Sequence, residues 1–256
     1  MGPRPSPPVL ALCAALSLLA ACGGGVPVLM YHSISEDGGA LTIAPAVFDQ
    51  HLAYLAKAGF TTVSLAQVVD EQEGRGSLPA YPIVLTFDDG YLDAVKTVLP
   101  LLQKRGQTGT FFVVSGFTGA DASHRYSDGK QEHVVESEVR QLAAAGMEIG
   151  SHTVKHLRLT GLKPAELRVE LDQSKSDLEK VLGSRVDFFS YPFTAQRSDI
   201  RAAVQRAGYR GAVAGPHGNG DPYDLQRITI HRGMTAQDLR GLLAESWATG
   251  YSTGSN

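Results

Sequence analysis

The sequence predicts a single α/β domain built on a parallel sheet. Stretches with strand character alternate with helical stretches through nearly the whole chain, which is typical of βαβ units. Ile83, Val84, Leu85 and Phe87 form a short apolar run with a β-branched bias, as expected for a strand buried on both faces. The length of 256 residues, with 43% hydrophobic content, suffices for one large core. An α/β barrel of this length is commonly one domain.

The first half of the domain is expected to contain four strands and three helices. The strands are 26–31, 61–64, 83–87 and 108–115, and the helices are 46–58, 65–73 and 92–104. The first helix carries Phe48, Leu52 and Leu55 on one face, and Gly59 ends it. Residues 116–131 are rich in Gly, Asp and Ser and are expected to form a loop.

The second half repeats the alternation. The strands are 147–151, 186–191, 209–214 and 227–231, and the helices are 134–145, 164–182, 198–207 and 235–247. The helix 164–182 is the longest one expected, because Pro164 suits a first turn and leucines at 167, 171, 178 and 182 form one stripe. Gly146 and Gly208 end two of the other helices.

The N-terminus has the features of a targeting segment. Arg4 precedes an apolar stretch, 9–20, that is too short to span a bilayer. The stretch ends in Leu-Ala-Ala-Cys at 19–22, which resembles the lipobox of bacterial lipoproteins. This resemblance implies a signal peptide over 1–21, a lipidated Cys22 with a glycine tether over 22–25, and a folded domain over 26–250. The alternative is an ordinary signal peptide with an incidental cysteine.

Composition narrows the possible functions. The net charge of −3 and the lack of basic runs give no indication of nucleic-acid binding. The two cysteines, Cys13 and Cys22, both lie in the targeting segment. The body of the protein therefore has neither a disulfide nor a thiolate metal site.

Polar residues recur where predicted strands end. His32, Asp88, Asp89, His152 and His231 each follow or close a strand. In a (β/α) barrel the carboxyl ends of the strands are where active sites are built. We therefore expect these side chains to meet in one site.

Asp88 and Asp89 follow the buried strand 83–87 and precede Gly90. Successive strand residues point to opposite sides, so the two carboxylates are expected to have different roles. One can bind a metal ion while the other remains free as a base. The alternative is that Asp-Asp-Gly only forms a turn, since Asp and Gly are common there.

His152 and His156 are four residues apart, in the sequence SHTVKH. This spacing is one helical turn, so both imidazoles can face one point. Two imidazoles and a carboxylate are a common ligand set for a catalytic divalent ion. The alternative is a pair of structural histidines.

TFDDG (86–90) and SHTVKH (151–156) resemble the first two motifs of the polysaccharide deacetylases, the NodB-homology domains of carbohydrate esterase family 4. The resemblance extends from PVLMYHSI (27–34) through FFSYPF (188–193) to about residue 240. PVLMYH and SYPF are most similar to the branch that acts on poly-N-acetylglucosamine. The resemblance implies a distorted (β/α)7 barrel and a metal-dependent polysaccharide de-N-acetylase.

By the same resemblance, Asp89, His152 and His156 hold the metal ion and Asp88 is the catalytic base. The ion is expected to be zinc, with cobalt, nickel or iron as alternatives. The family's acid is a histidine in a Leu-x-Leu-His motif, which Ile-Thr-Ile-His over 228–231 resembles. His231 is thus the expected acid, and His32 is a further candidate.

The third motif departs from the wider family. Many members precede it with an arginine that orients the base, but residues 188–193 contain none and Arg185 is too far back. The poly-N-acetylglucosamine branch also tends to lack this arginine. Tyr191, Pro192 and Phe193 are expected to wall the acetyl pocket, with core packing as the alternative. Asp221 and Asp224 are candidates to orient His231.

The sequence therefore predicts a monomeric, lipid-anchored enzyme of the bacterial cell envelope that acts outside the cytoplasmic membrane on N-acetylated polysaccharide. Two alternatives remain open. One is a deacetylase for peptidoglycan or a smaller amide on the same scaffold, and the other is a carbohydrate-binding lipoprotein that has lost catalysis. Retention of Asp88, Asp89, His152 and His156 argues against the last, because a binding protein needs no base beside a metal ion.

Overall fold

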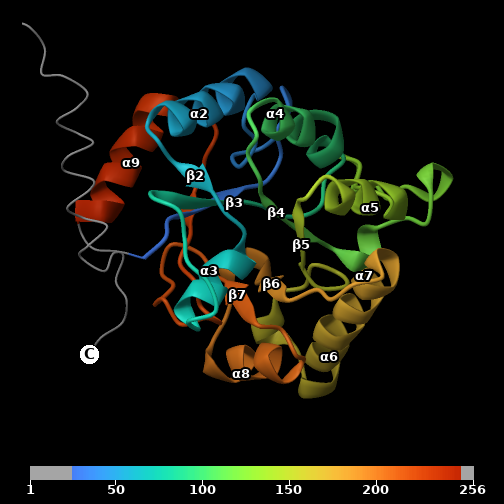
Figure 1. Cartoon of the computed structure of the whole chain (residues 1–256). Coiled ribbons are helices and arrows are strands. Elements are labelled where there is room, and N and C mark those ends of the chain that lie inside the picture. The colour runs from blue at the N-terminus through green and yellow to red at the C-terminus, as the bar shows by residue number, and fades with distance from the viewer. Residues whose placement is uncertain (1–24, 249–256) are drawn as a thin grey trace, which may run out of the picture.

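Eight parallel strands form a curled sheet in the computed structural model, which describes residues 25–248. Seven of them follow the order β7-β6-β5-β4-β3-β1-β8, and β2 pairs with β3 beside this path (Figure 1). The strands are β1 (Val28–Tyr31), β2 (Thr61–Thr62), β3 (Pro82–Phe87), β4 (Thr110–Val113), β5 (Glu148–Ser151), β6 (Phe188–Ser190), β7 (Gly211–Val213) and β8 (Ile228–Thr229). The predicted parallel (β/α)7 architecture is confirmed.

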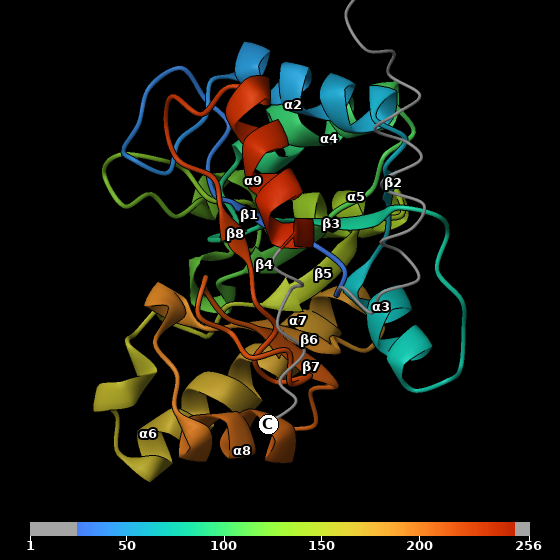
Figure 2. The ribbon, with the colours of Figure 1, turned by 90° about the vertical axis from the view of Figure 1, so that its left-hand side faces the viewer.

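Helices surround the sheet (Figure 1). They are α2 (Pro45–Lys57), α3 (Leu65–Gln72), α4 (Leu99–Lys104), α5 (Glu136–Ala144), α6 (Pro164–Arg168), α7 (Ser174–Leu182), α8 (Ser198–Arg206) and α9 (Ala236–Ala248). The last helix, α9, packs beside α2 near the start of the fold (Figure 2). His51 of α2 links the two regions, because its Nε2 donates to the Met234 carbonyl at 3.0 Å.

The predicted helix 164–182 is present but not regular throughout. A π-helical turn at Val169–Gln173 separates α6 from α7. Within this turn Glu170 is buried, and its carboxylate accepts hydrogen bonds from the amides of Val154 and Lys155, each at 2.9 Å. The irregular turn thus ties the helix to the loop that follows β5, as π turns at functional sites often do.

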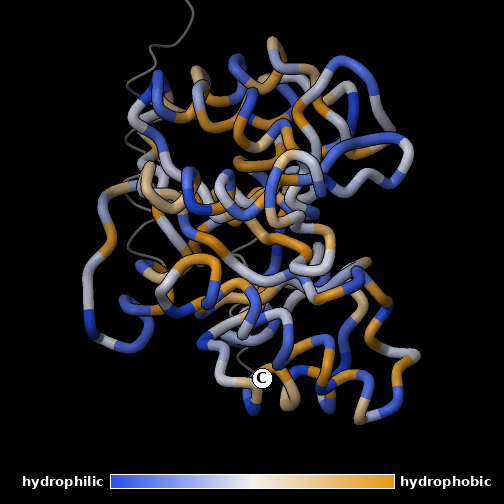
Figure 3. The backbone as a smooth tube through the Cα atoms, turned by 90° about the vertical axis from the view of Figure 1, so that its right-hand side faces the viewer, coloured by the Kyte–Doolittle hydropathy of each residue, from blue (hydrophilic) through white to orange (hydrophobic). Residues whose placement is uncertain are grey.

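The core divides between the two faces of the sheet, and hydrophobic segments fill the interior (Figure 3). Leu85 and Phe87 of β3 belong to the larger cluster beneath the helices, whereas Val84 belongs to the smaller one. This split follows the alternation of side chains along a strand. The smaller cluster joins Val28 of β1 to Val213 of β7, strands far apart in the sheet order. It therefore occupies the concave face.

One glycine makes room on that face. A Cβ atom added to Gly150 of β5 would lie 2.4 Å from Cδ1 of Phe112 and 3.1 Å from the Phe188 carbonyl oxygen. Phe112 is fully buried against this position. The absence of a side chain at residue 150 therefore lets the Phe112 ring lie flat across the strand that leads to His152.

The two edge strands of the path, β7 and β8, are connected by one segment. The Leu225 amide donates to the Ala212 carbonyl at 3.0 Å, and the Ala214 amide donates to the Leu225 carbonyl at 2.8 Å. The Arg227 amide then donates to the Gly215 carbonyl at 3.1 Å. Directly afterwards, Ile228 pairs with Leu29 of β1. Residues 225–229 therefore form the seam between the edges of the curled sheet.

Within residues 25–248, no helix has the length and apolar character needed to cross a bilayer. The predicted signal peptide over 1–21 and the predicted lipidation site, Cys22, lie outside the described residues.

Candidate metal and catalytic site

Asp89, His152 and His156 come together at the carboxyl ends of β3 and β5. Their ligand atoms all lie within 4.8 Å of one another. Asp89 Oδ1 is 3.4 Å from Nε2 of His152 and 3.3 Å from Nε2 of His156. Two ligands at about 2.0–2.1 Å from a tetrahedral ion lie roughly 3.3–3.4 Å apart, so the separation of Asp89 from each histidine is that of ligands in a zinc-type site.

The surrounding chain fixes which histidine nitrogen faces the cluster. His152 is buried, and its Nδ1 donates to the Ser190 carbonyl at 2.8 Å. This bond leaves the lone pair on Nε2, the atom that faces Asp89. An outer hydrogen bond of this kind is a regular feature of metal-binding histidines.

The two histidines do not lie on a helix, so the structural reason behind the sequence prediction is wrong. Residues 152–156 form an irregular loop in which Thr153 and His156 have φ angles of 71° and 53°. The Thr153 hydroxyl accepts a hydrogen bond from the His156 amide at 2.9 Å. The rings still converge, with centroids 4.8 Å apart, because a left-handed turn folds the loop back on itself.

The electrostatics of the cluster suit cation binding. Burial and, to a smaller extent, the charge of the nearby His152 lower the pKa of His156 to about 4, so His156 is neutral at pH 7. Burial raises the pKa of Asp89, but the neighbouring imidazoles, His152 first, outweigh this effect, and the pKa stays below its usual range. A neutral imidazole and an ionised carboxylate are the forms that bind metal ions.

Asp88 has partners entirely different from those of Asp89. Arg227 donates to both of its oxygens, from Nη1 to Oδ1 and from Nη2 to Oδ2, each at 2.8 Å. The Ser190 hydroxyl donates to Oδ2 at 3.1 Å. Burial raises the pKa of Asp88, yet the charges of Arg227 and His152 hold it below its usual range. Asp88 is thus an ionised carboxylate in a fixed orientation.

Arg227 supplies the orienting arginine that the third motif lacks. Its side chain is fully buried, and its Nε donates to the Ala214 carbonyl at 2.7 Å. No motif in the sequence points to Arg227, because it lies 139 residues beyond Asp88, directly before the last strand. The only signal was a charged residue directly before the apolar run 228–230.

The two candidate acids lie in different environments. His32 follows β1, next to Asp88, whose amide donates to the Tyr31 carbonyl at 3.0 Å. His32 Nδ1 is buried and has no hydrogen-bond partner. Burial lowers the pKa of His32, against the opposing charges of Asp88 and Asp89. His231 is exposed, and its amide contacts the Met234 sulfur at 3.4 Å.

Asp224 is not available to orient His231. Its carboxylate instead accepts from Gln196 Nε2 at 2.8 Å and pairs with Arg201 Nη1 at 3.3 Å. Asp221 is exposed and accepts a hydrogen bond from the Tyr223 amide at 2.8 Å.

The three residues expected to wall the acetyl pocket, Tyr191, Pro192 and Phe193, differ in their exposure. Tyr191 is 1% exposed and its hydroxyl donates to the Tyr223 carbonyl at 2.8 Å, so its side chain lies in the core and not in a pocket wall. Pro192 is also buried. Phe193 is 52% exposed, with its ring centroid 4.8 Å from that of His156 and with the Arg158 guanidinium 4.8 Å away. Phe193 is therefore the member that borders the cluster.

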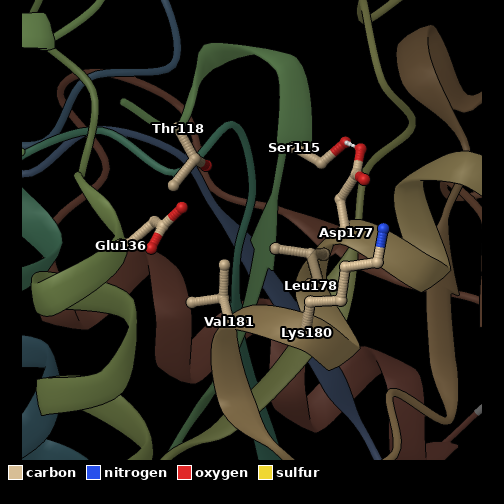
Figure 4. Close-up of a pocket in the computed structure, with 7 residues that line it drawn as sticks. All are labelled: Ser115, Thr118, Glu136, Asp177, Leu178, Lys180 and Val181. Carbon is tan, nitrogen blue, oxygen red and sulfur yellow. Dashed lines mark hydrogen bonds between the residues drawn. The ribbon is translucent and has the colours of Figure 1, made fainter. Parts of the chain in front are cut away.

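A separate cavity of about 290 Å³ lies between the end of β4 and the helices α5 and α7 (Figure 4). It is lined by Ser115, Thr118, Glu136, Asp177, Leu178, Lys180 and Val181. Ser115 and Asp177 contact each other across it at 3.4 Å. None of the metal-cluster residues lines this cavity.

The chain belongs to the polysaccharide deacetylase family, whose sequence pattern matches residues 75–212, more than half of its length. Members of this family are metal-dependent hydrolases that act on the amide bonds of acetylated polysaccharides. The fold and the site with Asp88 and Asp89 therefore occur in a chain whose family carries out a known reaction.

Two proteins with similar sequences carry deacetylase names. The Bacillus subtilis protein named "Putative polysaccharide deacetylase YxkH" is 29% identical over 216 residues, which are 82% of this chain and 73% of that protein. The poly-beta-1,6-N-acetyl-D-glucosamine N-deacetylase of Escherichia coli K12 is 26% identical over 138 residues, which are 50% of this chain and 20% of that enzyme.

Two solved structures share the fold. The Streptococcus pyogenes deacetylase PplD in complex with acetate aligns with a TM-score of 0.75 at 23% identity, covering 84% of this chain and 96% of that chain. IcaB from Ammonifex degensii aligns with a TM-score of 0.72 at 23% identity, covering 88% of this chain and 98% of that chain. At this identity the likeness concerns the fold alone.

Proposed function

We propose that this chain hydrolyses N-acetyl groups of a poly-N-acetylglucosamine-type polysaccharide, with Asp89, His152 and His156 holding one divalent cation, zinc in the first instance. The observation that carries the proposal is the convergence of these three donors beside a second carboxylate, Asp88, held apart from them by Arg227. A pure binding site has no need for two carboxylates with such different partners.

A divalent cation held by Asp89, His152 and His156 would supply Lewis-acid chemistry and would lower the pKa of water to about 7. Asp88 is the residue placed to accept the proton of the attacking water, because it is ionised and fixed in orientation. Arg227 donates two hydrogen bonds to this carboxylate and Ser190 one, and a carboxylate has about four acceptor positions, so one position remains to accept the proton.

The amide C–N bond can break only if the departing nitrogen is protonated. We propose His32, and not the exposed His231, as the proton donor. His32 adjoins Asp88, and its ring is partly exposed although its Nδ1 is buried, so the side chain can meet substrate through its accessible part. Because burial lowers the pKa of His32, its protonated form is a stronger acid than an ordinary imidazolium. The products are acetate and a free amine on the sugar.

The substrate proposal rests on the Escherichia coli relative, which acts on poly-beta-1,6-N-acetyl-D-glucosamine. The Bacillus subtilis enzyme PdaA, a peptidoglycan-N-acetylmuramic acid deacetylase, is 28% identical over 137 residues and supports the second candidate. The location proposal, an envelope lipoprotein anchored through Cys22, rests on the Leu-Ala-Ala-Cys sequence at 19–22.

The test is to incubate the zinc-loaded domain with three substrates in parallel: β-1,6-linked N-acetylglucosamine oligomers, β-1,4-linked oligomers, and peptidoglycan. Free amine and acetate are measured together, with an Asp88→Asn variant as the control. The proposal expects acetate and amine in equal amounts, fastest from the β-1,6 oligomers. Faster release from peptidoglycan would replace the substrate assignment, and no release from any of them would overturn the enzymatic proposal.

A further inference from the structure

Residues 132–134 lie along the turn that carries Asp89. The Leu92 amide donates to the Glu132 carbonyl at 2.8 Å, and the Val134 amide donates to the Gly90 carbonyl at 2.9 Å. Between these bonds, Tyr91 and His133 form an antiparallel bridge. We call residues 132–134 the strap. It is the short segment that fixes the backbone immediately after Asp89.

His133 extends this fixation to Asp89 itself. Its Nδ1 lies 3.0 Å from the Asp89 carbonyl oxygen, which can only accept, so Nδ1 carries the proton. His133 is 3% exposed, and its Nε2 is buried without a hydrogen-bond partner. The bond to Asp89 is therefore the one polar interaction of this imidazole among the described residues.

Aromatic rings hold the imidazole in place. Its centroid is 4.9 Å from that of Tyr91, 5.1 Å from that of Phe117 and 5.3 Å from that of Tyr126. Phe117 and Tyr126 also stack on each other at 4.2 Å. A ring packed on several sides keeps one orientation, so its Nδ1–H stays aimed at Asp89.

Asp89 needs such support because its backbone is strained. Its φ angle is 75°, in the left-handed region, which a residue other than glycine adopts at a cost unless the surroundings enforce it. The hydrogen bond from His133 holds the carbonyl of Asp89 and therefore the peptide plane between Asp89 and Gly90. If Asp89 left the left-handed region, this plane would turn and the bond from His133 would break, so the bond favours the backbone conformation in which the carboxylate faces His152 and His156.

The strap is itself anchored on its outer side. Arg125 Nη1 donates to the His133 carbonyl at 2.7 Å. The same guanidinium binds both oxygens of Glu138 at 2.7 and 2.8 Å, and Glu138 accepts the Val135 amide at 2.9 Å. The strap is thus tied to the first turn of α5 and does not depend on the metal cluster for its position.

We propose that His133 is a positioning residue that holds Asp89 in its metal-binding conformation through the Nδ1–H bond to the Asp89 carbonyl. The inference rests on the proposed metal site and adds to it a residue outside the ligand set. It predicts that metal affinity depends on a hydrogen-bond donor at residue 133, and not on the aromatic ring alone.

The test compares two substitutions by competition of the metal-free protein with a chelating dye for Zn²⁺. His133→Phe keeps the ring and removes the donor, and it should weaken Zn²⁺ binding about 10–100-fold, the usual effect of losing an outer-sphere partner. His133→Asn places an N–H close to the position of Nδ1 and should restore affinity to within about threefold of wild type. His124→Phe, at an exposed histidine of the same loop, is the matched control and should leave affinity unchanged.

Wild-type affinity in His133→Phe would overturn the inference, as would equal losses in the Phe and Asn variants. If His133→Phe does not fold, His133→Asn is compared with His133→Gln, whose amide corresponds to Nε2. Asn must then bind Zn²⁺ more tightly than Gln. An Asp89→Asn variant separates a failure of the metal site from a failure of the role of His133. Unchanged Zn²⁺ affinity in Asp89→Asn would overturn the metal site. Loss of Zn²⁺ affinity in Asp89→Asn, with wild-type affinity in His133→Phe, would overturn only the role of His133.

Discussion

Asp88 and Asp89 are adjacent in the chain but belong to different networks. Asp88 binds Arg227 and Ser190, whereas Asp89 faces His152 and His156. Asp88→Asn should retain the metal ion and lower turnover by about 10²–10⁴-fold, the usual contribution of a general base. Asp89→Asn should lose metal and activity together. Elemental analysis and the rate of acetate release, measured on the same preparations, check both expectations.

The division of roles fails if Asp88→Asn loses metal as severely as Asp89→Asn. If Asp88→Asn keeps both its metal and full activity, the base lies elsewhere, and His32 is the next residue to test.

The buried pair of Asp88 and Arg227 predicts a characteristic pattern of stability. Arg227→Met leaves the Asp88 carboxylate buried without a counter-charge, so the free energy of unfolding should fall by about 3–5 kcal/mol. Arg227→Met combined with Asp88→Asn removes both charges and should recover much of that loss. Urea unfolding of the two single variants and the double variant completes the cycle. Additive losses would show that the two side chains are not coupled.

Sequence reasoning could identify Asp88, Asp89 and His152 because each follows a recognisable strand, and His156 because it lies four residues after His152. It could not identify Arg227 or His133. Both act through bonds between segments distant in sequence, Arg227 to Asp88 and His133 to the Asp89 carbonyl. Such partners depend on how the sheet curls and how the 118–133 loop returns to it, and no local pattern encodes either.

At the scale of the element, β5 determines the position of His152, which directly follows it. Gly150→Ala would place a methyl group against the Phe112 ring, which cannot move freely in a packed core. Overpacking of this kind costs about 1–3 kcal/mol, so the free energy of unfolding should fall by that amount. Gly161→Ala is the matched control, because a Cβ there meets nothing within 4 Å. Equal stabilities of the two variants in urea would contradict this account of Gly150.

The elements themselves were largely predictable, since apolar periodicity and glycine stops define most of the strands and helices. The π turn at Val169–Gln173 was not, because it depends on Glu170 reaching the amides of Val154 and Lys155. The loop 152–156 shows the same limit. The spacing of His152 and His156 suggested a helical turn, but the chain uses left-handed residues to bring the rings together.

At the scale of the whole molecule, Cys22 leads to a prediction about the cellular location of the protein. Cys22→Ala should move the protein from the membrane fraction to the soluble fraction, because it removes the site of the proposed lipid anchor. Cell fractionation followed by immunoblotting measures the distribution, and Cys13→Ala is the matched control, expected to stay with the membranes. A Cys22→Ala protein that still sediments with membranes after a high-salt wash would contradict the lipoprotein assignment.

The seam at residues 225–229 links closure of the sheet to the orientation of the catalytic base. Arg227 donates its backbone amide to Gly215 and its guanidinium to Asp88, so the same residue closes the curled sheet and aligns the base. We therefore expect that opening of the seam at Arg227 also releases Asp88 from its hydrogen bonds. Local unfolding at the seam and loss of catalytic activity are then expected to occur together. Amide hydrogen exchange at Ala214, Leu225 and Arg227 should report the fraction of molecules that is momentarily inactive.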